Sequence, residues 1–288
     1  MFKKYKKKIN YLIKLGRYNS PEGAFLLMWP CFWGALAKFE NYLVLLESLI
    51  LFSLGSFIMR GAGCCINDLF DRKIDKLVER TKYRPLAQNK LKITEALIFI
   101  FIQLLLGLII ILQFNFKIII MGFVVIPLVI IYPLIKRISY FPQFILGLIF
   151  NWGIFIGYFS SNQILDWRIF FLYFAGVFLT ISYDTIYGFQ DIDDDKKIGV
   201  KSFSILIEKK PILFISIFYL ISFILFSSFF FSFYENLLFN VICCFFILNF
   251  FFFQVLDFIK KKELIKIFKS NIFYGAGISI LIFLSNYL

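Results

Sequence analysis

Long apolar runs recur along this whole chain, and they constrain its fold more than any other feature. The longest are near-continuous stretches of about 18 or more residues, enough for a helix to cross roughly 30 Å of hydrocarbon. No hydrophilic stretch is long enough to form a separate soluble domain. We therefore expect an all-α, polytopic membrane protein that forms a single domain over residues 1–288, with helices as the spanning elements. The nine expected spans cover residues 22–38, 43–66, 94–114, 116–135, 142–162, 168–189, 211–231, 236–257 and 270–287.

Basic residues are distributed unevenly between the two sides of this expected bundle. With the N-terminus in the cytoplasm, 27 Lys and Arg residues fall in cytoplasmic segments and three in outer segments. This asymmetry follows the positive-inside rule, which accounts for the net charge of +13 without a nucleic-acid partner. It places the acid-rich loops 67–95 and 190–210 on the same, cytoplasmic side, and we expect a bacterial inner membrane. Residues 1–20 are basic and sparsely apolar, which indicates an interfacial segment rather than a cleavable signal peptide.

The histidine and cysteine content of the chain excludes several kinds of active site. The chain has no histidine, which excludes histidine-based triads and imidazole metal ligands. Its five cysteines lie in apolar runs without a Cys-x-x-Cys pair, so neither a zinc site nor a disulfide framework is indicated. A metal would have to be held by oxygen ligands, which favours Mg²⁺.

The first acid-rich motif follows the second expected span. If the helix continues, Asp68, Asp71 and Asp75 lie at positions i, i+3 and i+7, within about 60° of one another around the helix. Three carboxylates on one face repel each other unless a cation lies between them. We expect these residues to bind Mg²⁺, which in proteins commonly bridges to substrate phosphates.

The second acid-rich motif ends the sixth expected span. Continuous helical spacing would align Asp184, Tyr187, Asp191 and Asp195 on one face, with Asp193 pointing nearly the opposite way. Asp184 and Tyr187 lie inside the apolar run, where an ionisable side chain is a candidate for function. Two acid clusters on one membrane side favour a shared site over two separately solvated helix ends.

Basic residues accompany both motifs. Arg60 lies within an apolar span, where it needs a partner or an anionic ligand, and it shares a helical face with Asn67. A diphosphate leaving group is stabilised by Mg²⁺ and by Arg or Lys side chains. The positive-inside rule accounts equally well for some of the loop cations. The candidate diphosphate ligands are Arg80, Arg84, Lys136, Arg137 and Lys201.

These motifs resemble those of a known family. The stretch Asn67–Asp75 matches the NDxxDxxxD signature of UbiA-type intramembrane aromatic prenyltransferases, and YDTIYGFQDIDDDKKIGVKS at 183–202 is similar to their second aspartate motif. The likeness is greatest to the branch that prenylates 4-hydroxybenzoate in ubiquinone synthesis. It is carried by RYNSPEGAFLLMWPCFWG at 17–34, RTKYRPL at 80–86, YPLIKRISYFPQFILG at 132–147 and FNWG at 150–153. Asn19 and Ser20 stand where that branch usually has a charged pair.

The resemblance implies nine transmembrane helices around a central cavity that opens sideways to lipid. It implies that Arg60 and Asn67 lie near the aromatic acid, and that Arg84 with Lys136 or Arg137 lies near the diphosphate. The expected reaction joins a polyprenyl diphosphate to the ring of 4-hydroxybenzoate and releases diphosphate. The implied catalytic and Mg²⁺-binding residues are Asp68, Asp71, Asp75, Asp191 and Asp195.

Three alternatives remain open. The acceptor of a prenyltransferase could instead be haem, a naphthoate, homogentisate or chlorophyllide. A transporter could use the acids to bind cations, but the chain shows no inverted halves with broken helices. An alcohol phosphotransferase would need an Asp-Gly…Ala-Arg spacing that is absent.

Overall fold

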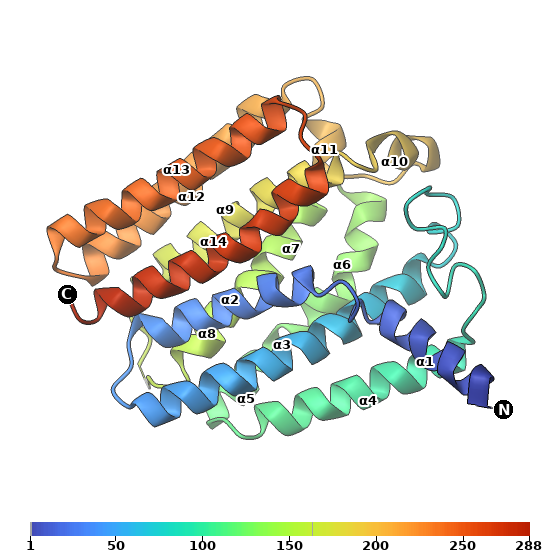
Figure 1. Cartoon of the computed structure of the whole chain (residues 1–288), viewed down its shortest axis with the longest axis horizontal. Coiled ribbons are helices and arrows are strands. Elements are labelled where there is room, and N and C mark those ends of the chain that lie inside the picture. The colour runs from blue at the N-terminus through green and yellow to red at the C-terminus, as the bar shows by residue number, and fades with distance from the viewer. Residues whose placement is uncertain (1, 163) are drawn as a thin grey trace.

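The computed structural model describes residues 2–162 and 164–288, without the side chains of residues 2–5 and 136. Every regular element in this described part is a helix (Figure 1). The helices are α1 (Phe2–Leu15), α2 (Glu22–Ala37), α3 (Tyr42–Asp71), α4 (Ile93–Ile111), α5 (Phe116–Val124), α6 (Ile126–Ile138), α7 (Pro142–Asn151), α8 (Gly153–Tyr158), α9 (Ile169–Gly188), α10 (Ile192–Ile198), α11 (Phe203–Leu206), α12 (Pro211–Phe233), α13 (Leu237–Ile259) and α14 (Leu264–Ser285).

The predicted membrane spans are confirmed as helices. Within the described ranges, seven helical stretches are long and apolar enough to cross a membrane: α3, α4, α5 with α6, α9, α12, α13 and α14. The other two expected spans correspond to α2, which has 16 residues, and to the shorter apolar stretch Pro142–Tyr158. The chain is therefore an all-α integral membrane protein with about nine spans.

Two helices form the centre of the bundle. Helix α2 packs against α3, α8 and α14, and α9 packs against α7, α12 and α14. Helices α4 and α13 lie at the edges of the bundle (Figure 1). The most apolar window of α9 is 72% buried, whereas that of α4 is 17% buried, so α4 presents most of its apolar surface to lipid.

Two expected spans are interrupted. The span 116–135 turns at Val125, between α5 and α6. Pro127 lies two residues later, and its backbone nitrogen has no hydrogen to donate to the helical hydrogen bonds. The span 142–162 is divided between α7 and α8 at Trp152, and α8 ends at Tyr158. The indole nitrogen of Trp152 donates to the carbonyl oxygen of Met121, 2.9 Å away, which ties the two interruptions together.

Helices α2 and α8 touch through their backbones. A Cβ atom at Gly157 would lie 1.9 Å from the carbonyl oxygen of Cys31, and one at Gly34 would lie 2.0 Å from that of Ile154. Small residues allow such close approach, which is a common way for helices to pack within a membrane. This contact fixes the distance between the central helix α2 and its neighbour α8.

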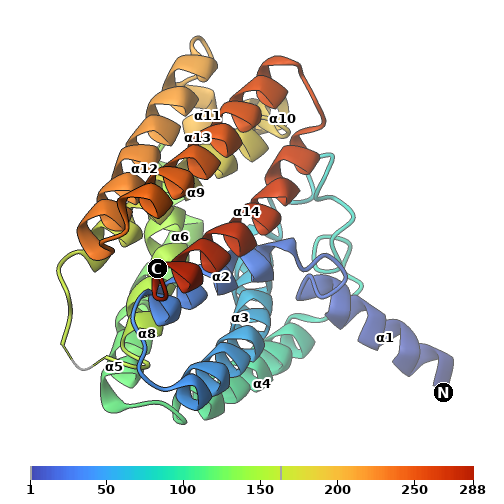
Figure 2. The same cartoon turned by 60° about the vertical axis from the view of Figure 1, so that its left-hand side comes forward.

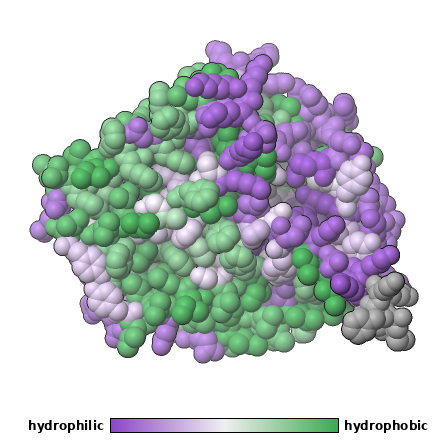
Figure 3. Space-filling model, viewed as in Figure 1, coloured by the Kyte–Doolittle hydropathy of each residue, from purple (hydrophilic) through white to green (hydrophobic). Residues whose placement is uncertain are grey.

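The polar surface gathers at one end of the bundle. In Figure 3 the hydrophilic surface covers the end where α1, loop 72–92 and α10 lie in Figure 1, and apolar surface covers much of the rest of that face. Figure 2 shows α1 projecting away from the bundle at this end. Both acid-rich motifs therefore lie at the same end, as predicted from the charge distribution.

The α2–α8 contact predicts that two glycine substitutions differ in their effect on thermal stability. Gly157→Ala should lower the apparent Tm of the detergent-solubilised protein by several degrees, because overpacking costs about 1–3 kcal/mol. Gly63→Ala is the control, since no atom lies within 4 Å of its added methyl group. Thermal unfolding measures both, and equal Tm values for the two variants would contradict the close contact.

Candidate active site

The first aspartate motif forms a buried acidic cluster at the end of α3. Asp68 and Asp71 lie in the last turn of α3, and Asp75 follows one turn later. The backbone N–H of Asp75 donates to the carbonyl oxygen of Asp71 at 2.8 Å, so the helical path continues briefly beyond the end of α3. The three residues are 1%, 1% and 5% exposed. Three buried carboxylates so close in the chain need positive charge nearby.

Arginines supply that charge. Nη1 of Arg84 contacts both Asp68 and Asp75, at 3.0 and 2.9 Å. Nη2 of Arg137 lies 3.8 Å from Asp71 and donates to the carbonyl oxygen of Phe70 at 3.0 Å. Burial raises the pKa of Asp75 above its usual value, although the charge of Arg84 opposes the shift. Arg84 and Arg137, two of the expected diphosphate ligands, thus lie against the acids of the first motif.

The second motif is divided between two helices. Helix α9 ends at Gly188, and Asp191 stands at the N-terminal cap of α10. The expectation of one continuous helix through Asp184, Tyr187, Asp191 and Asp195 is therefore wrong. Glycine is a weak helix former, and the carboxylates that follow Asp191 favour a new helix N-terminus. Asp195 still lies one turn after Asp191, and its N–H donates to the carbonyl oxygen of Asp191 at 2.8 Å.

Arg80 joins the two motifs. Its Nε and Nη2 donate to the carboxylate of Asp191 at 2.8 and 2.5 Å, and its Nη1 donates to the hydroxyl of Tyr187 at 3.2 Å. The backbone N–H of Glu79 also donates to Asp194, at 2.9 Å. Burial acts to lower the pKa of Arg80, but the bond to Asp191 and the neighbouring charges raise it overall. Arg80 therefore remains charged and holds the two loops together.

A second group of polar side chains lies deeper, inside the spans. The guanidinium carbon of Arg60 on α3 is 5.4 Å from the ring centre of Phe150. A Cβ atom at Gly23 would lie 2.4 Å from Nε of Arg60, so α2 passes close to this side chain. Arg60 also interacts electrostatically with Asp184 on α9 and Tyr132 on α6. The acid whose charge acts on Arg60 therefore lies on another helix, which sequence spacing along α3 could not reveal.

The positions of three other predicted site residues complete the description of the site. Lys201 donates to the carbonyl oxygen of Ile138 at 3.1 Å and lies over the ring of Tyr140, at the end of α6 rather than among the acids. Asn67 precedes Asp68 on α3. The side chain of Lys136 lies outside the described residues.

Arg17 is the site residue that sequence reasoning missed. It lies between α1 and α2, and its Nη2 donates to both oxygens of Asp68, at 2.9 and 2.9 Å. The contact joins residues 51 positions apart. Only its place in the segment RYNSPEG, next to the first central helix, could have drawn attention to it.

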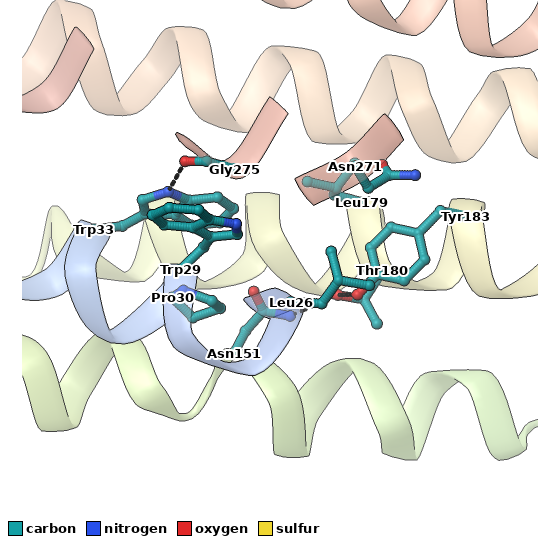
Figure 4. A pocket seen from close by; sticks show the side chains of 10 residues that line it. All are labelled: Leu26, Trp29, Pro30, Trp33, Asn151, Leu179, Thr180, Tyr183, Asn271 and Gly275. Carbon is teal, nitrogen blue, oxygen red and sulfur yellow. Dashed lines mark hydrogen bonds between the residues drawn. The ribbon is translucent and has the colours of Figure 1, made fainter. Parts of the chain in front are cut away.

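A small cavity lies deeper in the bundle, between α2, α7, α9 and α14. Its volume is about 10 Å³, room for about one water molecule. Figure 4 shows Trp33 donating to the carbonyl oxygen of Gly275, at 3.0 Å, and Asn151 bonded to Thr180. The lining residues are Leu26, Trp29, Pro30, Trp33, Asn151, Leu179, Thr180, Tyr183, Asn271 and Gly275.

The acids suit a hard divalent cation by their chemistry. Their ligand atoms are carboxylate oxygens, which Mg²⁺ prefers, and the chain offers no histidine as a competing ligand. Among the residues that the structure describes, however, no three acids converge closely enough to form a ready metal cage. Arginines lie against the carboxylates instead, at Asp68, Asp75 and Asp191. A cation bound to these carboxylates would compete with the arginines for their negative charge.

The motifs and their placement agree with a comparison against known families. A model described as the UbiA prenyltransferase family matches residues 27–277. The chain belongs to the UbiA prenyltransferase family. It is 46% identical over 191 residues to a protein from Drosophila melanogaster named mitochondrial 4-hydroxybenzoate polyprenyltransferase, covering 66% of this chain and 49% of that protein.

Bacterial and protist relatives extend this similarity. A 4-hydroxybenzoate octaprenyltransferase from Psychromonas ingrahamii is 39% identical over 222 residues, 77% of each chain. The mitochondrial relative from Dictyostelium discoideum is 40% identical, with 75% of this chain and 47% of that protein covered. The match thus spans about half the length of the mitochondrial proteins.

Solved structures show the same UbiA fold. A UbiA homologue from Archaeoglobus fulgidus bound to GPP and Mg²⁺ has a TM-score of 0.74 at 16% identity, covering 96% of this chain and all of that one. A UbiA homologue from Aeropyrum pernix has a TM-score of 0.72 at 20% identity, covering 92% and 96%.

The contact between the two loops predicts a cross-link. Cysteines introduced together at Glu79 and Asp194 should be joined rapidly by a short bis-maleimide in membranes, because these residues touch. The pair at Glu79 and Lys38 should stay unlinked, since Lys38 follows α2 at the opposite end of the bundle. Single-cysteine variants report any contribution from the native thiols. Equal linkage of the two pairs would show that the loops do not meet.

Proposed function

We propose that this protein transfers a polyprenyl group from a polyprenyl diphosphate to the ring of 4-hydroxybenzoate. The observation that carries the proposal is the pairing of two acidic motifs through Arg80 at the polar end of an apolar bundle. Such an arrangement suits a substrate with a charged diphosphate head and a long apolar tail. The names of the relatives support the same reaction.

The acidic and basic residues of the site would have different roles in the reaction. The carboxylates of Asp68, Asp71, Asp75, Asp191 and Asp195 would hold Mg²⁺. Mg²⁺ bound there would stabilise the charge that develops on the departing diphosphate. Arg80, Arg84 and Arg137, with Lys136 and Lys201, would bind the phosphate oxygens. An allylic cation would remain on the prenyl group, and the apolar surroundings would exclude water from it.

The acceptor would lie beside Arg60. Its guanidinium faces Phe150, so an aromatic acid could pair its carboxylate with Arg60 and pack its ring on that side chain. Asn67, Asp184 and Tyr187 would complete the polar contacts around the phenol. The ring carbon ortho to the hydroxyl would attack the allylic cation, a proton would leave, and the aromatic ring would be restored.

The membrane arrangement follows from the charge asymmetry. We propose that the N-terminus and both acidic motifs face the cytoplasm of a bacterium, because the basic loops gather on that side. The isoprenoid tail would then enter from the bilayer, and the diphosphate would leave into the cytoplasm.

A product assay tests the reaction. Membranes containing the protein, incubated with 4-hydroxybenzoate, a polyprenyl diphosphate and Mg²⁺, should yield the prenylated acid by mass spectrometry. Parallel incubations with a naphthoate, homogentisate or haem test the alternative acceptors. A product from one of these alone would assign another acceptor. Substrate movement across the membrane without a covalent product would indicate a transporter.

The carboxylates predict a metal requirement. Asp71→Asn and Asp191→Asn should each lower turnover by at least about a hundredfold, because each removes charge from the diphosphate site. EDTA should abolish product formation in the parent protein, and Mg²⁺ should restore it. Asp257→Asn is the matched control, since its carboxylate pairs with Lys262 near the end of α13, outside the two motifs. Full activity in EDTA would refute the role of the metal.

Arg60 predicts a selective effect on the acceptor. Arg60→Leu should raise the KM for 4-hydroxybenzoate much more than the KM for the prenyl diphosphate, since the lost guanidinium would pair with the benzoate carboxylate. Arg60→Lys keeps the charge but loses the fork of two donors, so it should be intermediate. Steady-state kinetics on both substrates measure the difference. A larger effect on the diphosphate would place Arg60 in the diphosphate site.

A further inference from the structure

The segment between α1 and α2 is fixed onto the first acidic motif. The hydroxyl of Tyr18 accepts a hydrogen bond from Nε2 of Gln103 at 2.9 Å, and Gln103 is 2% exposed. A Cβ atom at Gly61 would lie 2.4 Å from this hydroxyl, so Tyr18 rests on α3 where only glycine leaves room. We call residues 16–20 the elbow. The contacts of Tyr18 with α3 and α4 hold the elbow in place.

Arg17 adopts an unusual backbone conformation within the elbow. Its φ is +60°, in the left-handed region that residues other than glycine seldom adopt. Its Nη1 donates to the carbonyl oxygen of Lys14 at 2.8 Å, while Nη2 contacts both oxygens of Asp68. The side chain of Arg17 is 26% exposed and that of Asp68 is 1% exposed. A strained backbone is thus combined with an ion pair in which a single nitrogen of Arg17 contacts both oxygens of a buried acid.

The arginine contacts of Asp68 compete with a cation for its negative charge. Arg17 covers both of its oxygens, and Arg84 contacts one of them as well. Mg²⁺ requires its ligands at about 2.0–2.1 Å in a near-octahedral arrangement, and its two positive charges repel a guanidinium that contacts the same oxygens. A cation that binds Asp68 therefore weakens the contacts of Arg17 and Arg84.

Of the two arginines, Arg17 has fewer contacts with acids. Arg84 is also bonded to Asp75, so it retains an acidic partner if it loses Asp68. Arg17 has Asp68 as its one acidic partner among the ion pairs of the described chain. Its other side-chain bonds are local, to the carbonyl oxygens of Lys14 and Leu15.

We propose that Arg17 is a counter-ion of Asp68 that a divalent cation displaces, so that metal loading loosens the elbow. The inference rests on the proposed role of Asp68 as a metal ligand. Linkage makes the effect reciprocal: if the cation weakens the Arg17–Asp68 bond, that bond weakens cation binding by the same factor. Arg17 thereby sets the affinity of the site for its metal.

Binding of Mn²⁺ to the purified, substrate-free protein tests this competition. Arg17→Gln should bind Mn²⁺ about tenfold more tightly than the parent protein, as measured from free Mn²⁺ by electron paramagnetic resonance. Arg17→Lys retains the charge with a single contact and should fall between them. Lys14→Gln removes the same charge from the end of α1, where its exposed side chain does not contact Asp68. Its affinity should change little.

The outcomes separate the alternatives. If Arg17→Gln and Lys14→Gln tightened Mn²⁺ binding equally, the loss of one positive charge would explain the effect without any specific contact. That result would overturn the proposal. Unchanged or weaker binding by Arg17→Gln would also overturn it. If the parent protein binds no Mn²⁺, or Asp71→Asn binds as well as the parent, the metal role in the proposed function fails and takes this inference with it.

Hydrogen exchange provides a second readout on the unaltered protein. Adding Mn²⁺ should speed amide exchange at residues 16–20 by several-fold, because the elbow loses its anchor on Asp68. Amides in the middle of α9, at residues 175–181, should not change. Slower exchange in the elbow on adding Mn²⁺ would show that the cation tightens the contact, contrary to the proposal.

Discussion

The need to neutralise three buried carboxylates at the end of α3 underlies much of this structure. Isolated charges in an apolar interior cost far more than paired ones, so each acid must find a cation. Arg84, Arg137 and Arg17 reach α3 from three different segments of the chain. The loop after α3, the end of α6 and the elbow before α2 are thereby drawn to one place.

The second acidic motif applies the same principle across a greater distance. Arg80 comes from the loop that follows α3, yet it bonds to Asp191 and Tyr187, more than a hundred residues later. The two motifs thus hold each other through charges of opposite sign. A substrate head carrying negative charge and metal ions would enter a region where both signs are already arranged in pairs.

The sequence predicted much of the fold because lipid imposes a simple rule on helix length and polarity. The seven long spans of the described chain were foreseen, helices lie at the two other expected spans, and the joint location of the acidic motifs was foreseen as well. The turns at Val125 and Trp152 were not, because proline and glycine occur freely within membrane helices. The break after Gly188 was also missed, although Asp193 to Asp195 carry the signature of a helix start. Arg17 was missed because a left-handed residue and a distant ion pair leave no periodic pattern.

The small cavity between α2 and α14 has a consequence for lipid exchange. It has space for about one water molecule, is bounded by Trp29 and Trp33 against Gly275, and does not itself form a tunnel for an isoprenoid. An apolar chain could enter there only by parting α2 from α14, and acyl chains of the bilayer would compete for the opened space. Its affinity would then depend on lateral pressure and acyl-chain order, so the surrounding lipids would act as a competing solvent for the tail.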